Sequence, residues 1–295
     1  MSEHPVEKGI AGVVRTYELL DRVRTRQDLV IRDDQFDHEP LLDAARYAAR
    51  RRICLSLLDT GRFGLTELEA LAREGARVLT SDEARPRADE WEILLETCRA
   101  SRTHLSVFWN GPLPSAEGTG GISFQTVTDL LGRGMDLHVS NRTRARDAGL
   151  LAELAAGTKA GRGYLVYYHH GPLVPELAGP AGRGAWVHFS DRNSADGTWA
   201  GLAVEISRAA ASAGARAAVY VERGLPLELL EKLWTAGAAL LFLTPPSDDR
   251  SLLGPIERKA AKRKLPPRAS ISPRLSSPNL KKLALPLQYG SHERA

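Results

Sequence analysis

Polar residues able to do acid–base chemistry stand directly after several apolar, strand-like runs of this sequence. A histidine pair follows the run YLVYY, a glutamate follows AAVYV, and aspartates end other runs of the same kind. Imidazole and carboxylate groups exchange protons near neutral pH and also ligate divalent cations. If the protein is an enzyme, its candidate catalytic residues are therefore His169, His170, Asp191, Glu222, Asp34 and Asp59. The sequence leaves the presence and identity of a metal unknown.

Each of these positions also has a structural interpretation. Asp, Asn and Ser oxygens accept hydrogen bonds from backbone amides at helix N-caps and in turns. This reading applies to Asp59, Ser81, Asp82, Asn141 and Asp191. The histidine pair precedes Gly171 and Pro172, a turn sequence, and Glu222 has Arg223 beside it as an ion-pair partner.

Polar residues inside four of the runs form a second set. They alternate with large apolar neighbours, so they would share one face of a strand. Buried hydroxyl and imidazole groups need hydrogen-bond partners, and an interior polar layer is the interpretation that competes with a functional site. The residues are Ser56, Ser106, His138 and His188.

Several sequence signatures of known chemistry are missing. The sequence has no phosphate-binding P-loop, no dinucleotide-binding GxGxxG before a helix, no GxSxG nucleophile turn and no HxH at an early strand end. Outside the C-terminal segment, lysine occurs only at Lys8, Lys159 and Lys232, none on a strand, which argues against Schiff-base chemistry. We therefore predict no cofactor. The glycine-rich stretch 117–121 is either a phosphate-binding loop before a helix or simply a flexible loop.

The elements that must position these residues follow a repeating pattern. Nine short apolar runs begin near residues 28, 53, 76, 103, 136, 163, 185, 215 and 238. Most are separated by stretches with apolar residues at helical spacing, as at Leu65, Leu68, Leu71 and Ala72. Strands joined by helices run parallel, because a parallel neighbour is reached through a crossover. The sequence predicts an α/β fold of repeated strand–helix units forming an irregular, TIM-like (β/α)8 barrel.

An open doubly wound sheet is the alternative fold. A horseshoe of leucine-rich repeats has a similar period, but its consensus fails in most repeats. Glycines at 75, 134, 214 and 237 close the helical stretches before the next strand. The link between Tyr168 and Ala185 is too short for an ordinary helix, whereas residues 13–23 have the spacing of an amphipathic helix.

One segment, LLDTGRFGLTELEALAREGARVLTSDE, resembles a strand–helix unit of the cyclic-di-GMP phosphodiesterase barrels. It covers less than a tenth of the chain. That family's strand-end glutamate and its other metal-ligand motifs do not occur here in order, so the resemblance assigns no residue.

Charge divides the chain at about residue 254. The protein has 295 residues and a net charge of +4, yet residues 254–295 hold ten Lys or Arg against two Glu, together with six prolines. We predict a single barrel-like domain over 1–253, including the N-terminal helix, followed by a basic, proline-rich and largely disordered docking tail over 254–295.

The tail combines basic residues with leucines, which suits docking on a protein groove or a sister subunit. Nucleic acid is the weaker alternative partner, since Tyr289 is the only aromatic residue in the tail. The residues expected to bind the partner are Lys262, Arg263, Lys264, Leu280, Lys281, Lys282, Leu283 and Leu285.

Composition favours a soluble protein of the cytoplasm. There are only two cysteines, no membrane-spanning apolar run and no secretory signal at the N-terminus. The sequence thus predicts an interaction or scaffold protein that docks through its basic tail. The alternative is a TIM-barrel-type enzyme with acid–base or metal-assisted chemistry at the carboxyl ends of its strands.

Overall fold

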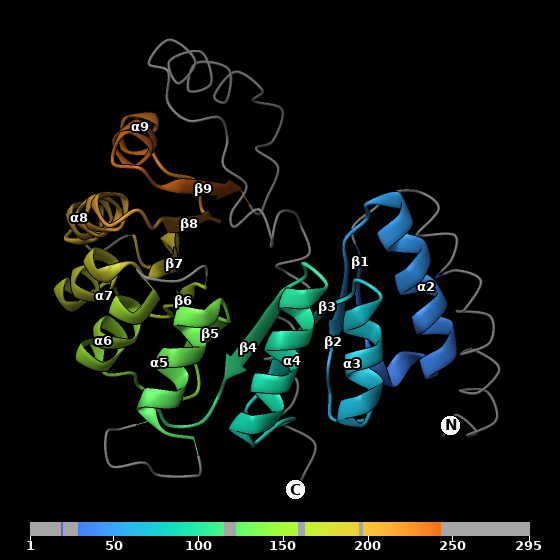
Figure 1. Ribbon diagram of the computed structural model, residues 1–295. Helices are drawn as coiled ribbons and strands as arrows, with labels where there is room; N and C mark the ends of the chain where they lie inside the picture. The colour runs from blue at the N-terminus through green and yellow to red at the C-terminus, as the bar shows by residue number, and fades with distance from the viewer. Residues whose placement is uncertain (1–18, 20–28, 115–121, 159–162, 195–196, 243–295) are drawn as a thin grey trace, which may run out of the picture. The chain divides into compact units, whose positions relative to one another are not determined.

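The computed structural model describes residue 19 and residues 29–114, 122–158, 163–194 and 197–242 (Figure 1). Strands and helices alternate along these ranges and form two compact units. The N-terminal unit comprises Met1–Val139 with Gly157–Leu165, and the C-terminal unit comprises Ser140–Ala156 with Val166–Ala295.

In the N-terminal unit, consecutive strands pair in parallel and lie in chain order. They are β1 (Leu29–Arg32), β2 (Leu55–Leu58), β3 (Arg77–Ser81), β4 (Leu105–Trp109) and β5 (Asp136–Ser140), whose last residue belongs to the other unit. The connections hold η1 (Asp33–Gln35), α2 (His38–Arg51), α3 (Leu65–Arg73), α4 (Ala88–Ala100) and α5 (Phe124–Arg133). Helix α3 packs against both α2 and α4, so these three helices share one side of the sheet (Figure 1).

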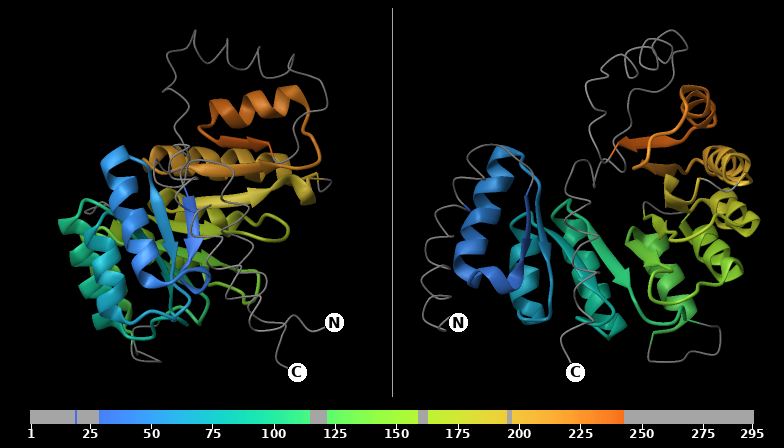
Figure 2. Two further views of the ribbon diagram at one scale, coloured as in Figure 1. Left: turned by 90° about the vertical axis from the view of Figure 1, so that its right-hand side faces the viewer. Right: turned by 180° about the vertical axis from the view of Figure 1, so that it is seen from behind.

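The C-terminal unit repeats this arrangement. Its parallel strands, again in chain order, are β6 (Leu165–Tyr168), whose first residue belongs to the N-terminal unit, β7 (Trp186–Ser190), β8 (Ala217–Val221) and β9 (Ala239–Phe242). Helices α7 (Ala178–Arg183), α8 (Trp199–Ser212) and α9 (Leu227–Thr235) pack in sequence beside one another, as Figure 2 shows. The remaining elements are α6 (Ala148–Thr158), η2 (Pro175–Leu177) and η3 (Asp191–Asn193).

The apolar periodicity of the sequence explains where the core lies. Trp91, Leu94, Leu95 and Cys98 form the buried stripe of α4, and every residue of β4 is buried. Strands covered on both faces carry near-continuous apolar runs, as parallel strands do. The glycines predicted to close helices all have positive φ, for example 111° at Gly134, the left-handed conformation that a helix C-terminus favours.

The predicted fold class is confirmed. Repeated strand–helix units with strands in chain order are the TIM-like (β/α)8 pattern, here with nine strands among the described residues. A doubly wound sheet needs a reversal of strand order, and neither unit contains one. The short link after β6 holds only η2 and the six-residue α7, ended by Gly184.

Three sequence predictions lie outside the described residues: the amphipathic helix over 13–23, apart from Leu19, the glycine-rich stretch 117–121, and the tail over 254–295. No described helix has the length and apolar character needed to cross a membrane.

Two glycine-to-alanine substitutions test the packing. A Cβ at Gly163 would overlap the carbonyl oxygens of Met135 and Leu131, whereas a Cβ at Gly201, within α8, would meet nothing within 4 Å. We expect G163A to lower the free energy of unfolding by about 1–3 kcal/mol. G201A should raise it by about 0.5–1 kcal/mol, since alanine is the better helix former. Urea unfolding of both variants measures this, and equal effects would contradict the packing at Gly163.

Candidate functional site

Side chains at the ends of the strands bond to the backbone just beyond the next strand. In the N-terminal unit, Asp33 Oδ1 accepts hydrogen bonds from the amide (3.1 Å) and hydroxyl (2.6 Å) of Thr60. The two carboxylate oxygens of Asp82 accept from the amides of Asn110 (2.8 Å) and Gly111 (2.7 Å). These carboxylates therefore fix the loop that follows the neighbouring strand.

The C-terminal unit has the same kind of hydrogen bond between a strand-end side chain and the backbone beyond the next strand. The Asp191 carboxylate is fully buried and accepts from the amides of Glu222 (2.8 Å) and Arg223 (3.0 Å). Asn141 Oδ1 accepts from the amide of His170 (2.7 Å), while Asn141 Nδ2 donates to the carbonyl of the same residue (2.9 Å). Asp191 and Asn141 thus hold the loops after β8 and β6.

The helix-cap interpretation is wrong for Asp59, Ser81 and Asp82, which lie several residues before the N-caps of the helices that follow them. The N-cap positions of α3 and α4 are Gly64 and Arg87, and neither cap comes directly after a strand. The turn interpretation holds for two of them: Asp59 Oδ1 accepts from the amide of Gly61 (2.9 Å), and Ser81 Oγ from that of Ala84 (3.0 Å).

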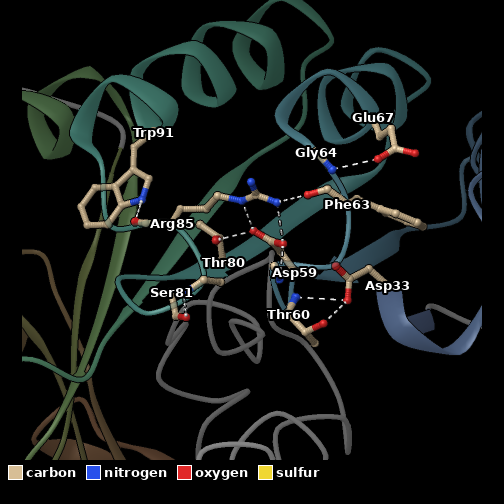
Figure 3. Close-up of polar contacts among 12 residues, drawn as sticks. Asp33, Asp59, Thr60, Phe63, Gly64, Glu67, Thr80, Ser81, Arg85 and Trp91 are labelled. Atoms are coloured by element: carbon tan, nitrogen blue, oxygen red, sulfur yellow. Dashed lines mark hydrogen bonds and ion pairs between the residues drawn. The ribbon is translucent and has the colours of Figure 1, made fainter.

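Asp59 is the acceptor in a buried ion pair (Figure 3). Arg85 approaches it through Nε (2.9 Å) and a terminal nitrogen (3.2 Å), and that nitrogen also donates to the carbonyl of Phe63. The Thr80 hydroxyl donates to Asp59 Oδ2 (2.7 Å), the oxygen that also accepts from Arg85 Nε. The Arg85 carbonyl in turn accepts from the indole of Trp91 (2.9 Å). The pair is thus surrounded by polar contacts from the loop after β2, from β3 and from α4.

The six candidate catalytic residues are divided between the two units. Asp34 and Asp59 belong to the N-terminal unit, where Asp34 lies on η1 in an exposed ion pair with Arg32 and Asp59 is occupied by Arg85. His169, His170, Asp191 and Glu222 belong to the C-terminal unit and lie at the carboxyl ends of β6, β7 and β8.

The two histidines differ in what their rings contact. His169 Nε2 lies 2.8 Å from the carbonyl oxygen of Pro172, which requires a protonated Nε2 as donor. Its Nδ1 then accepts from Asn141 Nδ2 at 3.3 Å. The His170 ring is exposed and forms no hydrogen bond with any other residue in the described ranges.

The pKa values of both histidines are lowered. Partial burial is the main cause for each. For His170, the positive charges of Arg142, His169 and Arg192 lower the pKa further. A lowered pKa keeps the imidazole of His170 neutral at physiological pH, the form that can accept a proton.

Glu222 orients an arginine. Its Oε2 accepts from Arg192 Nε at 2.7 Å and also lies 2.7 Å from Arg192 Nη2, while its Oε1 accepts from the Ser190 hydroxyl at 2.9 Å. The Glu222 side chain is 20% exposed and that of Arg192 is 68% exposed. Glu222 therefore bonds to Arg192 rather than to the adjacent Arg223 that the sequence suggested.

The mid-strand polar residues are buried. His188 lies 2.9 Å from the hydroxyl of Tyr220, and His138 stacks on Phe108 with ring centroids 4.6 Å apart. Burial lowers the pKa of His138 to about 3. The other two, Ser56 and Ser106, are 8% and 5% exposed.

Sequence reasoning missed Arg85 and Arg192. Arg85 lies 26 residues from Asp59, and Arg192 lies 30 residues from Glu222, so no local pattern pairs them. One sequence signal did point to this region. Apolar runs that end in a carboxylate recur at the spacing of one strand–helix unit. Within the described ranges, no group of three or more His, Cys, Asp or Glu residues is arranged to hold a metal ion.

No protein-family model and no curated protein sequence matches the chain. Several solved structures are similar to it, including the following two. One, from Coccidioides immitis and described provisionally as a fructose-1,6-biphosphate aldolase, is 18% identical over 69% of this chain and 76% of its own, with a TM-score of 0.34. The other, the tetrameric deoxyribose phosphate aldolase of Aeropyrum pernix, is 14% identical over 85% and 97%, with a TM-score of 0.33.

The prediction of an interaction or scaffold protein is corrected on this finding. The similar structures are described as aldolases, which are enzymes, and the tail that suggested the scaffold lies outside the described residues. With TM-scores this low, the similarity transfers no residue, substrate or reaction to this chain.

Breaking the Asp59–Arg85 pair tests its contribution to stability. We expect D59N to lower the free energy of unfolding by about 3–5 kcal/mol, because the buried Arg85 loses its counter-charge. R85K keeps the charge but loses the two-pronged contact, so its loss should be smaller. The control D89N removes the exposed partner of Arg87 and should leave the urea midpoint unchanged. A D59N protein as stable as the control would contradict this assignment.

The burial of His138 predicts that the free energy of unfolding decreases as the pH falls. Its pKa is about 3 in the folded protein against an ordinary value of 6.5, so the unfolded chain takes up the proton first. Neutral His138 causes no loss of stability above pH 6.5. As the pH falls from 6.5 toward 3, the free energy of unfolding falls by up to about 1.4 kcal/mol per pH unit. Urea unfolding over this range should show a shallower pH dependence for H138M, and an unchanged slope would contradict the prediction.

Proposed function

We propose that the protein is a TIM-barrel-type enzyme that performs acid–base chemistry at the carboxyl ends of the strands of its C-terminal unit, with His170 as the proton-transferring group. One observation carries the proposal. Asn141 bonds to both the amide and the carbonyl of His170, so the backbone is fixed while the exposed ring bonds to no described residue.

The electrostatic surroundings of His170 suit a general base. The groups that act on its charge are Arg142, His169 and Arg192, and all of them disfavour the imidazolium form. A neutral imidazole takes a proton from a substrate, and the same positive surroundings stabilise negative charge that develops on that substrate. Removing a proton next to an electron-withdrawing group is the reaction class that this arrangement supports.

The other predicted residues hold this centre in place. Asp191 anchors the amides of Glu222 and Arg223, and Glu222 orients Arg192. His169 fixes the turn through the Pro172 carbonyl. We assign Asp191, Glu222 and His169 positioning roles, and we assign no catalytic role to Asp34 or Asp59, whose carboxylates are engaged by Arg32 and Arg85.

Two further expectations stay proposals. The cytoplasm remains the proposed compartment, and it agrees with Cys54 and Cys98 forming no disulfide. The tail over 254–295, with the binding residues predicted there, lies outside the described residues. Contact of that tail with a sister subunit or another protein is proposed from its composition alone and takes no part in the enzyme assignment.

Substituting His170 tests the proposed reaction. The purified protein is incubated with a mixture of cellular metabolites, and consumption and formation of compounds are followed by mass spectrometry. We expect turnover by the wild type and a loss of roughly 10²–10⁴-fold in H170N, the usual contribution of a general base. The pH–rate profile of the wild type should lose activity on the acid side, where His170 becomes protonated.

The matched control is H104N. His104 immediately precedes β4, at the opposite, amino end of a strand of the N-terminal unit, so its loss leaves the carboxyl-end loops intact. Equal turnover by wild type, H104N and H170N would rule out His170 as the base.

A further inference from the structure

Three loops of the C-terminal unit bring cationic side chains beside His170. The amide of Asn141 donates to the Tyr168 carbonyl (3.3 Å), which sets Arg142 next to the end of β6. The amide of His169 donates to the His188 carbonyl (2.7 Å), and Tyr168 lies opposite His188 in the parallel register. Arg142, His170 and Arg192 therefore follow the ends of β5, β6 and β7 at one edge of the unit.

Three carboxylates described at the strand ends and loops around His170 are already engaged. Asp191 accepts from two backbone amides, and Asp147 accepts from the amide of Leu150 at the start of α6. Glu222 is bonded by Ser190 and Arg192. The loop over 141–147 alone carries Arg142, Arg144 and Arg146 against the single Asp147. Arginines thus outnumber the acids in this loop, and Asp147, Asp191 and Glu222 are each bonded already.

Glu222 orients the Arg192 guanidinium and leaves several of its N–H donors without a bond to Glu222. A guanidinium has five N–H donors, and the two nitrogens bonded to Glu222 use only part of them. Since the Arg192 side chain is 68% exposed, its remaining donors face solvent. Arg142 is also exposed and is bonded to no carboxylate in the described ranges.

We propose that Arg142 and Arg192 together bind the phosphate group of an anionic substrate beside the ring of His170. Two guanidinium groups from separate loops suit a dianion with three outward oxygens better than a carboxylate with two. This inference rests on the proposed function for its location, and it adds the chemical class of the substrate. The bound phosphate holds the rest of the substrate next to the imidazole that removes its proton.

Titration of the full-length protein with inorganic phosphate tests the site. The protein is followed by NMR of its histidine rings and by calorimetry at constant ionic strength, with acetate in a parallel titration. We expect saturable phosphate binding that is stronger than acetate binding, and a rise in the pKa of His170 because the dianion favours the imidazolium form.

Matched arginine variants locate the binding. R142Q and R192Q should each weaken phosphate binding by about tenfold, the value of a charge-assisted hydrogen bond. R208Q, on the exposed face of α8 in the same unit, is the control and should bind as the wild type does. Equal affinity of R142Q, R192Q and R208Q, or acetate binding as strong as phosphate binding, would overturn the inference.

The two proposals fail in distinguishable ways. Loss of phosphate binding in R142Q and R192Q without any His170-dependent turnover would support the phosphate site and contradict the enzyme assignment. His170-dependent turnover without phosphate binding would support the enzyme and contradict the phosphate site.

Discussion

The backbone amides just beyond each strand constrain this structure more than any other groups. These amides have left the sheet ladder and need other acceptors, because an unpaired buried amide costs about 1–3 kcal/mol. The protein supplies those acceptors from the preceding strand: Asp33 serves Thr60, Asp82 serves Asn110 and Gly111, and Asp191 serves Glu222 and Arg223. Each bond ties the loop after one strand to the end of its neighbour, so the loops that carry the polar residues are positioned by the sheet.

This constraint also decides which polar residues remain for chemistry. A carboxylate that accepts two backbone amides, or one that is paired with a buried arginine as Asp59 is, has its oxygens occupied. Residue type alone would make all of these carboxylates equal candidates. Their contacts separate them from His170, whose backbone is held while its ring bonds to no described residue. The candidate site is found by following hydrogen bonds, because a group already satisfied by the fold has little left to offer a substrate.

The fold was largely predictable because its signals are local. Apolar runs located all nine described strands, and the periodicity of 91–98 and 199–210 located α4 and α8. Polar contacts such as Asp59–Arg85 and Asp191–Arg223 were not predictable, since their residues lie 26 and 32 positions apart in the sequence. The cap interpretation failed for the same reason: strand-end oxygens bond across to the next loop, while α3 and α4 begin several residues later at Gly64 and Arg87. The histidines and Glu222 were placed correctly at strand ends, but Arg192, which completes their surroundings, has no sequence signal of its own.

Asn141, which has a side-chain amide where Asp82 and Asp191 have carboxylates, shows how these strand-to-loop hydrogen bonds can also serve chemistry. Asp82 and Asp191 each face two donors, for which a carboxylate is the matching acceptor. Asn141 faces both a donor and an acceptor on His170, its amide and its carbonyl, and a side-chain amide can satisfy both at once. An aspartate there would leave that carbonyl without its donor and would place a negative charge beside the imidazole, raising its pKa. Asn141 thus fixes the His170 backbone without adding charge, so the lowered pKa of the ring is left to partial burial and to Arg142, His169 and Arg192.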